Sequence, residues 1–424
     1  MILIYVLNIL LIAFLINALY VRERFQPLHN FFYMALLIKL LAGIALGLIY
    51  KYYYLNKGDT FLYFQDAITL SKIFIKKPVE YFQIIFNHQF TNNLVSDFSF
   101  TNQPRAFFMV KILSPFAIIT HNNYWLSSLY LSFFSFLGCW KLANLLAYKF
   151  PAYEIGAAIA FLFLPSFVFW SSGIIKESIL IGCLCLSISF LFQNSFNGFK
   201  GLIKIFFIAF SIFIIFQIKY YYLAIILPIL IAYYITDIFF KNKKYQFQII
   251  AFLILFISTF ILSTFIHPNL NYNIFISALV KNHDINIRGG KNALHIYFDN
   301  LQPTPLSLVK NIPLAFVSGL YRNFVWEAKS GFQYLIGFEN LLLLLLSFYT
   351  IFQLINKKIN IQFPLLLTAT LVFIILLAVL LSLSSPNFGS LSRYKSGYIP
   401  FFFYILSFSV FKNKMKSGDI NNLS

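Results

Sequence analysis

"FFYMALLIKLLAGIALGLIY", residues 31–50, is a run of twenty residues in which Lys39 is the one charged side chain. A helix of about 20 residues is long enough to cross the roughly 30 Å hydrocarbon core of a bilayer. The whole chain has the same character, because 60% of its 424 residues are hydrophobic and only 11% are charged. Soluble domains carry roughly 25% charged residues. The sequence therefore predicts an all-α, polytopic transmembrane helix bundle.

Apolar runs of similar length recur along the chain and set the predicted topology. Residues 306–325 are apolar but short and interrupted, so this segment either crosses the membrane or re-enters it. The count is then about 11–12 spans in a single transmembrane domain, residues 1–424, with amphipathic helices in two long outer loops, 51–122 and 267–330. The expected spans are residues 2–20, 31–50, 123–147, 153–171, 178–193, 201–217, 222–240, 247–266, 331–355, 362–383 and 396–411.

Basic residues are distributed unevenly between the two sets of short connections. One set, with the C-terminus, holds thirteen lysines and arginines, whereas the opposite set holds four. Positive charge accumulates on the cytoplasmic side of membrane proteins. We therefore expect a bacterial inner (cytoplasmic) membrane protein with its N-terminus outside and its C-terminus inside. The net charge of +19 is explained by residues that flank the spans and meet the lipid bilayer, so no nucleic-acid partner is expected.

The segment "GDTFLYFQDA", residues 58–67, places two carboxylates in a chain that has few. On a helix that begins near Thr60, Asp59, Tyr63 and Asp66 share one face. Asp59 would then either cap this helix or act as a general base or metal ligand at the membrane surface. Both carboxylates are candidate catalytic residues. No cofactor is certain, although two carboxylate groups on one face leave a divalent metal possible.

This segment resembles the first outer loop of GT-C glycosyltransferases, integral-membrane enzymes that use polyprenyl-phosphate-linked sugars. In that family an acidic residue of this loop is the catalytic base or a metal ligand, and Asp59 is the matching position. A second stretch, "SLSRYKSGYIPF" at residues 390–401, is similar to a late basic element of several such enzymes. The resemblance implies that Arg393 meets the donor phosphate, with Tyr394 and Lys395 beside it. It also implies a GT-C-like fold and a glycan, lipid or protein acceptor.

Other charged residues gather in the predicted outer connections. Lys176 and Glu177 are adjacent, so on a helix they point about 100° apart and are expected to have different partners. Lys219 lies beside three tyrosines, where it is either a snorkelling lysine in an aromatic belt or a phosphate-binding group. Arg105 begins an amphipathic segment of the first long loop. All four are candidate substrate-binding residues, although ordinary interfacial turns explain the same pattern.

The segment before residue 331 combines aromatic and charged side chains. Arg322 and Trp326 are four residues apart and would stack if the segment were helical, with Glu327 next to them. Sugar-binding sites combine aromatic platforms with polar groups at the rim, so these three residues are candidates for substrate binding together with Tyr63.

The favoured function is transfer of a sugar from a polyprenyl-phosphate-linked donor to an acceptor on the outer (periplasmic) side, with Asp59 as general base. An O-antigen polymerase or oligosaccharide ligase is the first alternative. It would rely on arginines in the outer loops, namely Arg105, Arg288, Arg322 and Arg393. A transporter or flippase for a lipid-linked sugar is the second alternative, and it would need a charged central cavity but no indispensable carboxylate.

Overall fold

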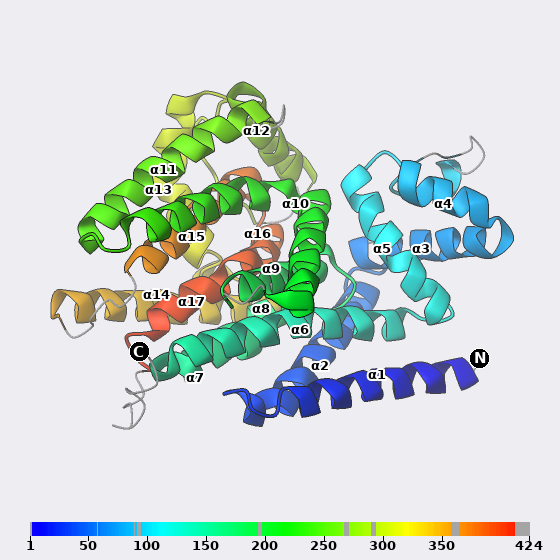
Figure 1. Cartoon of the computed structure of the whole chain (residues 1–424). Coiled ribbons are helices and arrows are strands. Elements are labelled where there is room, and N and C mark those ends of the chain that lie inside the picture. The colour runs from blue at the N-terminus through cyan, green and yellow to red at the C-terminus, as the bar shows by residue number, and fades with distance from the viewer. Residues whose placement is uncertain are drawn as a thin grey trace. The chain divides into compact units, whose positions relative to one another are not determined.

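A computed structural model describes residues 2–56, 58–88, 90, 95–193, 197–266, 271–289, 294–357 and 364–411 (Figure 1). Within these ranges the chain is helical, and an isolated bridge between His295 and Asn387 is its one β-type pairing. The α-helices are α1 (Ile2–Arg22), α2 (Phe32–Tyr52), α3 (Asp59–Lys76), α4 (Pro78–Asn87), α5 (Pro104–Ile119), α6 (Tyr124–Lys149), α7 (Glu154–Ala158), α8 (Pro165–Trp170), α9 (Lys176–Leu191), α10 (Gly198–Phe240), α11 (Tyr245–Ile266), α12 (Tyr272–Gly289), α13 (Pro305–Tyr321), α14 (Gly331–Ile355), α15 (Pro364–Ser384), α16 (Phe388–Tyr394) and α17 (Ile399–Ser407).

Seven helices in the described part of the chain are long and apolar enough to cross a bilayer, which indicates a multi-pass membrane protein. The prediction of an all-helical bundle is therefore confirmed. The predicted 11–12 spans are supported only in part, because several of them are short, broken or merged. The seven are helices α1, α2 with its preceding turn, α6, α10, α11, α14 and α15.

The predicted span 153–171 is not one helix. The chain runs through α7, a π-helical turn at Ile159–Phe163 and then α8. Leu164 is extended, with ψ of 115°, since the proline that follows disfavours helical geometry in the preceding residue. Hydropathy did not reveal this break because the side chains on both sides of it are apolar.

Two further predicted spans differ in their boundaries. Residues 201–217 and 222–240 form one continuous run, α10, which is interrupted at Lys219 where φ is −148° and ψ is 75°. Residues 396–411 contain α17, which is only nine residues long. The segment 306–325, for which the sequence allowed either a span or a re-entrant segment, contains α13, a helix of 17 residues that ends at Tyr321.

The chain divides into two compact units. Unit 1 comprises Met1–Leu164 and Val168–Lys219, and unit 2 comprises Pro165–Phe167 and Tyr220–Ser424. That the chain forms a single transmembrane domain stays a prediction.

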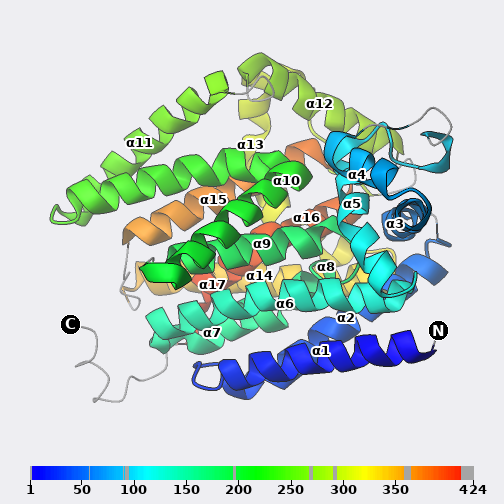
Figure 2. The same cartoon turned by 45° about the vertical axis from the view of Figure 1, so that its right-hand side comes forward.

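In unit 1, α6 packs against α9 and α2, and α3 packs against α5 (Figures 1 and 2). The α6–α9 contact depends on two glycines. A Cβ at Gly138 would lie 2.2 Å from the carbonyl oxygen of Gly182, so only glycine permits this approach. Close packing over small residues is typical of helices that associate within membranes.

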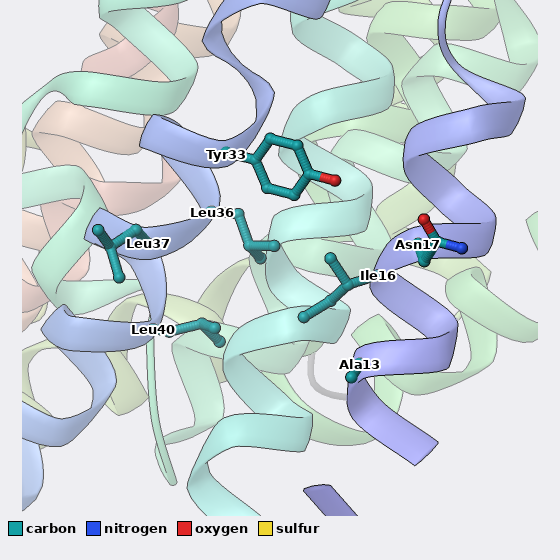
Figure 3. A pocket seen from close by; sticks show the side chains of 7 residues that line it. All are labelled: Ala13, Ile16, Asn17, Tyr33, Leu36, Leu37 and Leu40. Carbon is teal, nitrogen blue, oxygen red and sulfur yellow. The ribbon is translucent and has the colours of Figure 1, made fainter. Parts of the chain in front are cut away.

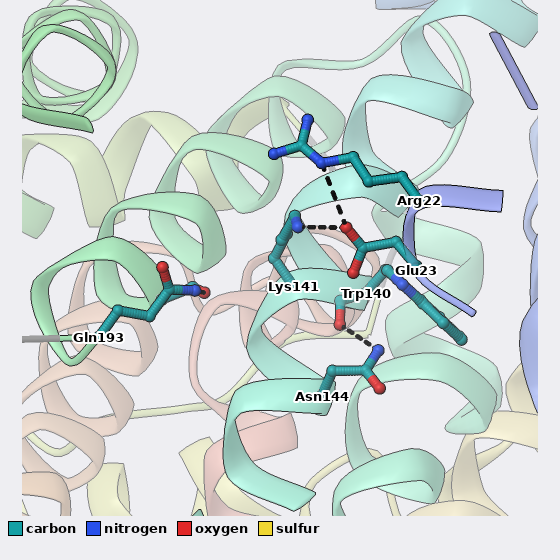
Figure 4. A network of polar contacts seen from close by, with 7 residues as sticks. Arg22, Glu23, Trp140, Lys141, Asn144 and Gln193 are labelled. Atoms are coloured by element: carbon teal, nitrogen blue, oxygen red, sulfur yellow. Dashed lines mark hydrogen bonds and ion pairs between the residues drawn. The ribbon is translucent and has the colours of Figure 1, made fainter. Parts of the chain in front are cut away.

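The connection between α1 and α2 is fastened to α6 by polar contacts (Figure 4). Lys141 Nζ lies 2.5 Å from Oε1 of Glu23, whose side chain is almost fully buried, and Arg22 Nε lies 3.9 Å from the same oxygen. The backbone amide of Leu28 donates to Asn144 Oδ1 at 3.0 Å. These residues lie near the end of α6, whereas its first residue contacts the first long loop. Tyr124 at one end of α6 is therefore roughly 25–30 Å along the helix from Lys141 and Asn144, which suits opposite faces of a bilayer.

In unit 2, α15 packs against α13, α12 and α11. A buried apolar cluster of Leu279, Val280, Ala315 and Leu383 joins three of these helices. At the other end of the unit, α14 packs against α17 and against the short 3-10 turn Val325–Glu327.

The first long loop contains the helices expected there, since α3 and α4 occupy most of residues 60–92. The buried face of α3 carries Thr60, Tyr63, Phe64, Asp66, Ala67, Leu70, Ser71 and Ile73. Asp59, Tyr63 and Asp66 were predicted to share one face, and two of them, Tyr63 and Asp66, are directed into the protein rather than toward solvent.

Candidate functional site

The first turn of α3 holds Asp59, the predicted catalytic base. Gly58 occupies the N-cap position without a side-chain capping bond, so the alternative that Asp59 caps this helix is wrong. A carboxylate within the first turn is favoured by the positive end of the helix dipole. Asp59 is half-buried. The next residue, Thr60, shares a hydrogen bond of 2.9 Å between its hydroxyl and that of Tyr124, which fixes the start of α3 to the start of α6.

A buried apolar cluster lies beneath the start of α3. It consists of Leu46 and Tyr50 from the end of α2, and of Trp170 and Ile175 from the segment before α9. Phe61 of α3 packs against it and also stacks on the Tyr124 ring, with centroids 4.3 Å apart. This cluster brings the first turn of α3 and the segment before α9 into one neighbourhood of unit 1.

The segment before α9 is a turn enclosed by helices rather than the exposed interfacial turn that the sequence also allowed. Ser171 and Ile175 have no exposed surface. Gly173 has a φ of +73° and donates its amide to Ser132 Oγ at 2.9 Å. Lys39, for which the sequence offered no partner, donates from Nζ to Ser171 Oγ. The chain thus turns sharply inside the helix packing and emerges at Lys176.

Lys176 and Glu177 have different partners, as predicted from their adjacency. Nζ of Lys176 lies 5.2 Å from the centre of the Tyr63 ring, in the geometry of a cation–π contact. Oε1 of Glu177 lies 2.8 Å from Nζ of Lys219, in a pair whose side chains are 0% and 7% exposed. We call Asp59, Tyr63, Lys176, Glu177 and Lys219 the α3–α9 site.

Lys219 belongs to this site through Glu177. Lys219 has non-helical backbone angles and forms the kink in α10, and its ammonium reaches Glu177 in the first turn of α9. The ammonium and the carboxylate compensate each other in an environment where an unpaired charge is costly. Lys219 therefore supports the site from within, and Lys176, which is only half-buried, is the better placed of the two lysines to meet a ligand.

Asp66 links α3 to the segment that precedes α5. Both of its carboxylate oxygens accept from the backbone amide of Ser99, at 3.1 and 3.0 Å, and this holds the segment before α5 against α3. Burial raises the pKa of Asp66, and the hydrogen bonds from Ser99 and Phe100 oppose that shift. The arrangement favours a structural role over the predicted catalytic one.

A metal ion shared by Asp59 and Asp66 is not favoured by this geometry. The two residues are seven positions apart, or about 10 Å along the helix axis, and both oxygens of Asp66 accept from the amide of Ser99. Among the described residues, no group of three or more His, Cys, Asp or Glu side chains is placed to hold a metal ion.

Arg105 is exposed in the first turn of α5, which packs against α3. Further along α5, Lys111 donates from Nζ to the carbonyl of Ile85 at 2.6 Å, and burial lowers the pKa of Lys111. The first long loop is therefore a closed cluster of helices, with Arg105 on its outside.

In unit 2, the predicted stack of Arg322 on Trp326 is wrong, because α13 ends at Tyr321 and the following residues are not α-helical. Glu327 Oε1 instead accepts from Arg322, at 2.8 Å to Nε and 2.7 Å to Nη2. The Trp326 ring stacks on Phe324, with centroids 4.7 Å apart and planes 12° from parallel. Trp326 is 72% exposed.

Lys395 is buried and its ammonium is used within the protein. Nζ donates to the carbonyls of Leu320 and Arg322, at 3.0 and 2.5 Å, and to Asn340 Oδ1 at 3.3 Å. Burial lowers the pKa of Lys395 to about 7. The predicted contact between Lys395 and substrate is not favoured by this geometry, since the side chain fastens the end of α13.

The neighbouring residues Arg393 and Tyr394 form the last turn of α16 and are half-buried. Pro400 lies in the first turn of α17, where the missing amide of proline costs no hydrogen bond. Glu339, an acid within α14, accepts from the amide of Ser166 at 2.8 Å and from its hydroxyl.

Two pockets in the described residues lie away from these side chains. One of about 350 Å³ lies between α1 and α2 and is lined by Ala13, Ile16, Asn17, Tyr33, Leu36, Leu37 and Leu40 (Figure 3). Another, of about 410 Å³, follows one side of α12 and includes Lys281, Asp284 and Arg288. Arg288, one of the arginines of the polymerase alternative, is exposed in the last turn of α12.

Two residues of these networks were not identified from the sequence. Tyr124 binds Thr60, the neighbour of Asp59, and Ser99 binds Asp66, yet both are ordinary polar residues with no distinguishing pattern. Asn340, which binds Lys395, lies inside a predicted span, and that position was a signal of a buried partner.

No known protein family matches the chain, and neither curated proteins nor solved structures show significant similarity to it. The functional argument therefore rests on the geometry of its own residues.

Proposed function

We propose that this protein is a membrane glycosyltransferase of GT-C type. It would transfer a sugar from a polyprenyl-phosphate-linked donor to an acceptor hydroxyl at the outer surface of a bacterial cytoplasmic membrane. In this proposal the N-terminus is outside and the C-terminus is cytoplasmic.

The observation that carries the proposal is the contact between Lys176 and Tyr63. Asp59 lies one turn before Tyr63 on the same side of α3, so its Cβ is about 5–6 Å from that of Tyr63. A half-buried cation thus lies over the Tyr63 ring, one helical turn along α3 from a half-buried carboxylate. Glycosyl transfer from a lipid phosphate needs both groups, one for the phosphate and one for the acceptor.

Each residue has a defined part in the proposed reaction. Lys176 holds the donor phosphate, assisted by the positive end of α9. Asp59 removes the proton from the acceptor hydroxyl as its oxygen forms a bond to the anomeric carbon. The bond between that carbon and the phosphate oxygen breaks, and polyprenyl phosphate leaves with the electron pair. The Glu177–Lys219 pair keeps the first turn of α9 in place.

The test is transfer of radiolabelled sugar by purified protein in nanodiscs, with decaprenyl-phosphate- and undecaprenyl-phosphate-linked monosaccharides as donors. Asp59→Asn is expected to lower the turnover by about 10²–10⁴-fold, which is the usual contribution of a general base. Donor binding should persist. Asp97→Asn, at an exposed acid in the same loop, is the matched control and should keep normal turnover.

Other results would contradict the proposed function or indicate another class of protein. Full turnover in Asp59→Asn would refute the assignment of the base. Movement of an intact lipid-linked sugar across liposomes, without any transfer, would identify a transporter. Elongation of a lipid-pyrophosphate oligosaccharide, with no use of monosaccharide donors, would identify a polymerase.

A further inference from the structure

The turn between α13 and α14, residues 322–328, is fixed by more contacts than a connecting loop requires. Glu327 accepts from Arg322 on one oxygen and from the amide of Phe324 on the other, the latter at 3.0 Å. This closes the turn on itself. The side chain of Glu327 is 18% exposed, so the ion pair is largely shielded from solvent.

The same turn is also held from outside. Lys395 Nζ donates to the carbonyl of Arg322, and Asn340 Nδ2 donates to the carbonyl of Asn323 at 2.9 Å. Gly337 of α14 lies so close that a Cβ there would be 2.9 Å from the Cα of Val325. The backbone on both sides of Trp326 is therefore anchored to α14 and to the segment before α17.

These anchors present one flat aromatic surface. The Trp326 indole rests on Phe324 in a nearly parallel stack, so one of its faces is covered and the ring is held in one orientation. The residue is nevertheless 72% exposed, which leaves the opposite face open. The same short segment carries the exposed Lys329 and the half-buried ion pair of Arg322 and Glu327.

We propose that the 322–328 turn is a carbohydrate-binding platform, in which the open face of Trp326 stacks against a sugar ring of the acceptor glycan. The assignment of that glycan as the acceptor rests on the proposed function. Trp326 is the contact residue, whereas Lys395, Asn340 and Glu327 are positioning residues.

The chemistry of a sugar ring matches this surface. One side of a pyranose presents C–H groups, which pack on an aromatic face, and its edge presents hydroxyls, which need donors and acceptors. A rigid indole in a segment that also carries Arg322, Glu327 and Lys329 offers both kinds of group. Holding the ring in place before binding reduces the entropy that is lost when the complex forms. A tryptophan that only anchors the protein at the lipid interface needs no such bracing, because it is ordered by the headgroup region itself.

The test measures sugar binding without any donor, so it is independent of transfer. Trp326 is the most exposed of the four tryptophans, since Trp140 and Trp170 are buried and Trp125 is half-buried. Iodide quenching of the purified protein in nanodiscs therefore reports chiefly on Trp326. The probes are maltotetraose, chitotetraose and mannotetraose. We expect at least one of them to protect the fluorescence from iodide with a saturable, millimolar dissociation constant.

Variants separate the platform from a lipid anchor. Trp326→Leu keeps apolar bulk but removes the flat face, and it should weaken binding of the active probe by about tenfold, measured by calorimetry. Trp326→Phe should recover part of that loss. Phe348→Leu, at an exposed aromatic residue of α14 outside the turn, is the matched control and should leave binding unchanged. Glu327→Gln should weaken binding by a smaller factor, because it loosens the turn without removing the ring.

Three outcomes would overturn the proposal. The first is that none of the probes protects the fluorescence or binds by calorimetry. The second is that Trp326→Leu binds as tightly as the unmodified protein. The third is that Phe348→Leu weakens binding equally. A failure of the proposed function gives a different result. The purified protein would then transfer no sugar, whereas the probe would still protect the fluorescence and Trp326→Leu would still remove that protection.

Discussion

The buried ion pair of Glu177 and Lys219 gives a quantitative prediction about the α3–α9 site. The two groups are 2.8 Å apart and have 0% and 7% exposed side chains, so removal of one leaves the other charged and buried. Breaking a buried pair in this way typically costs about 3–5 kcal/mol, whereas replacing both partners by apolar residues is often neutral. We expect Lys219→Met and Glu177→Gln each to destabilise the protein by about 3 kcal/mol or more.

The assay is a double-mutant cycle on the free energy of unfolding. Unfolding is followed by titration of dodecyl sulfate into dodecyl maltoside micelles, with reversibility checked by dilution. The double variant Glu177→Leu/Lys219→Met should be less destabilised than either single variant, which gives a favourable coupling energy of about 2–3 kcal/mol between the two sites. Lys219 also occupies the kink of α10, so its replacement tests whether the pair holds that kink.

The matched control is the pair of Lys77 and Glu80 in α4. Its atoms are 3.2 Å apart, but its lysine side chain is 71% exposed. Exposed pairs contribute about 0–1 kcal/mol, so Lys77→Met should have little effect. If Lys219→Met were no more destabilising than Lys77→Met, or if the cycle gave no coupling, the argument that burial makes this pair important would be refuted.

Two further predictions concern the surroundings of the site. Burial raises the pKa of Asp66 above its ordinary value of 3.8, so the folded state holds the proton more tightly and the free energy of unfolding should fall as pH rises above about 4. Asp66→Asn keeps an acceptor for the Ser99 amide and should flatten that decline in unfolding measured between about pH 4 and pH 7; an unchanged slope would contradict it. Gly173→Ala should cost about 1–3 kcal/mol in the same unfolding assay, because the residue has a φ of +73° and its new Cβ would lie 3.2 Å from the Gly43 carbonyl. Gly198→Ala, with a φ of +63° and no atom within 4 Å, controls for the dihedral angle alone, and equal costs would show that the packing contributes nothing.

The spans that the sequence predicted well are those in which hydropathy and backbone continuity coincide. Helices α1, α2 and α14 are long apolar runs without an internal break, so length and composition determined them. The errors at 153–171 and 396–411 have a different origin. In both segments the apolar run is longer than the helix inside it. The extended Leu164 divides residues 153–171, and α17 covers only nine residues of 396–411. Hydropathy reports on side chains and is insensitive to such interruptions.

The hydrogen-bond partners of the polar residues could not be predicted from the sequence for another reason. Lys39 and Ser171 are 132 positions apart, and Glu177 and Lys219 are 42 apart. Their hydrogen bonds depend on how helices pack, which a single sequence does not encode in any local pattern. What the sequence did indicate was that each charge within an apolar run needs a partner, and the structure supplies one for Lys39 and Glu177.

That distinction also ranks the predicted site residues. A charged or polar group whose hydrogen-bonding capacity is used by the protein is most simply explained as part of the scaffold, because a ligand could bind it only after those bonds had broken. Lys395, with three acceptors on its ammonium, and Asp66, with both oxygens on one amide, belong to this group. Lys176 differs because it is half-buried and its ammonium lies 5.2 Å from the centre of the Tyr63 ring, at the start of α9. Trp326 differs because it is 72% exposed although its ring is stacked on Phe324. In unit 1 and in unit 2 alike, the scaffold contacts therefore hold a side chain that keeps an accessible surface for a ligand.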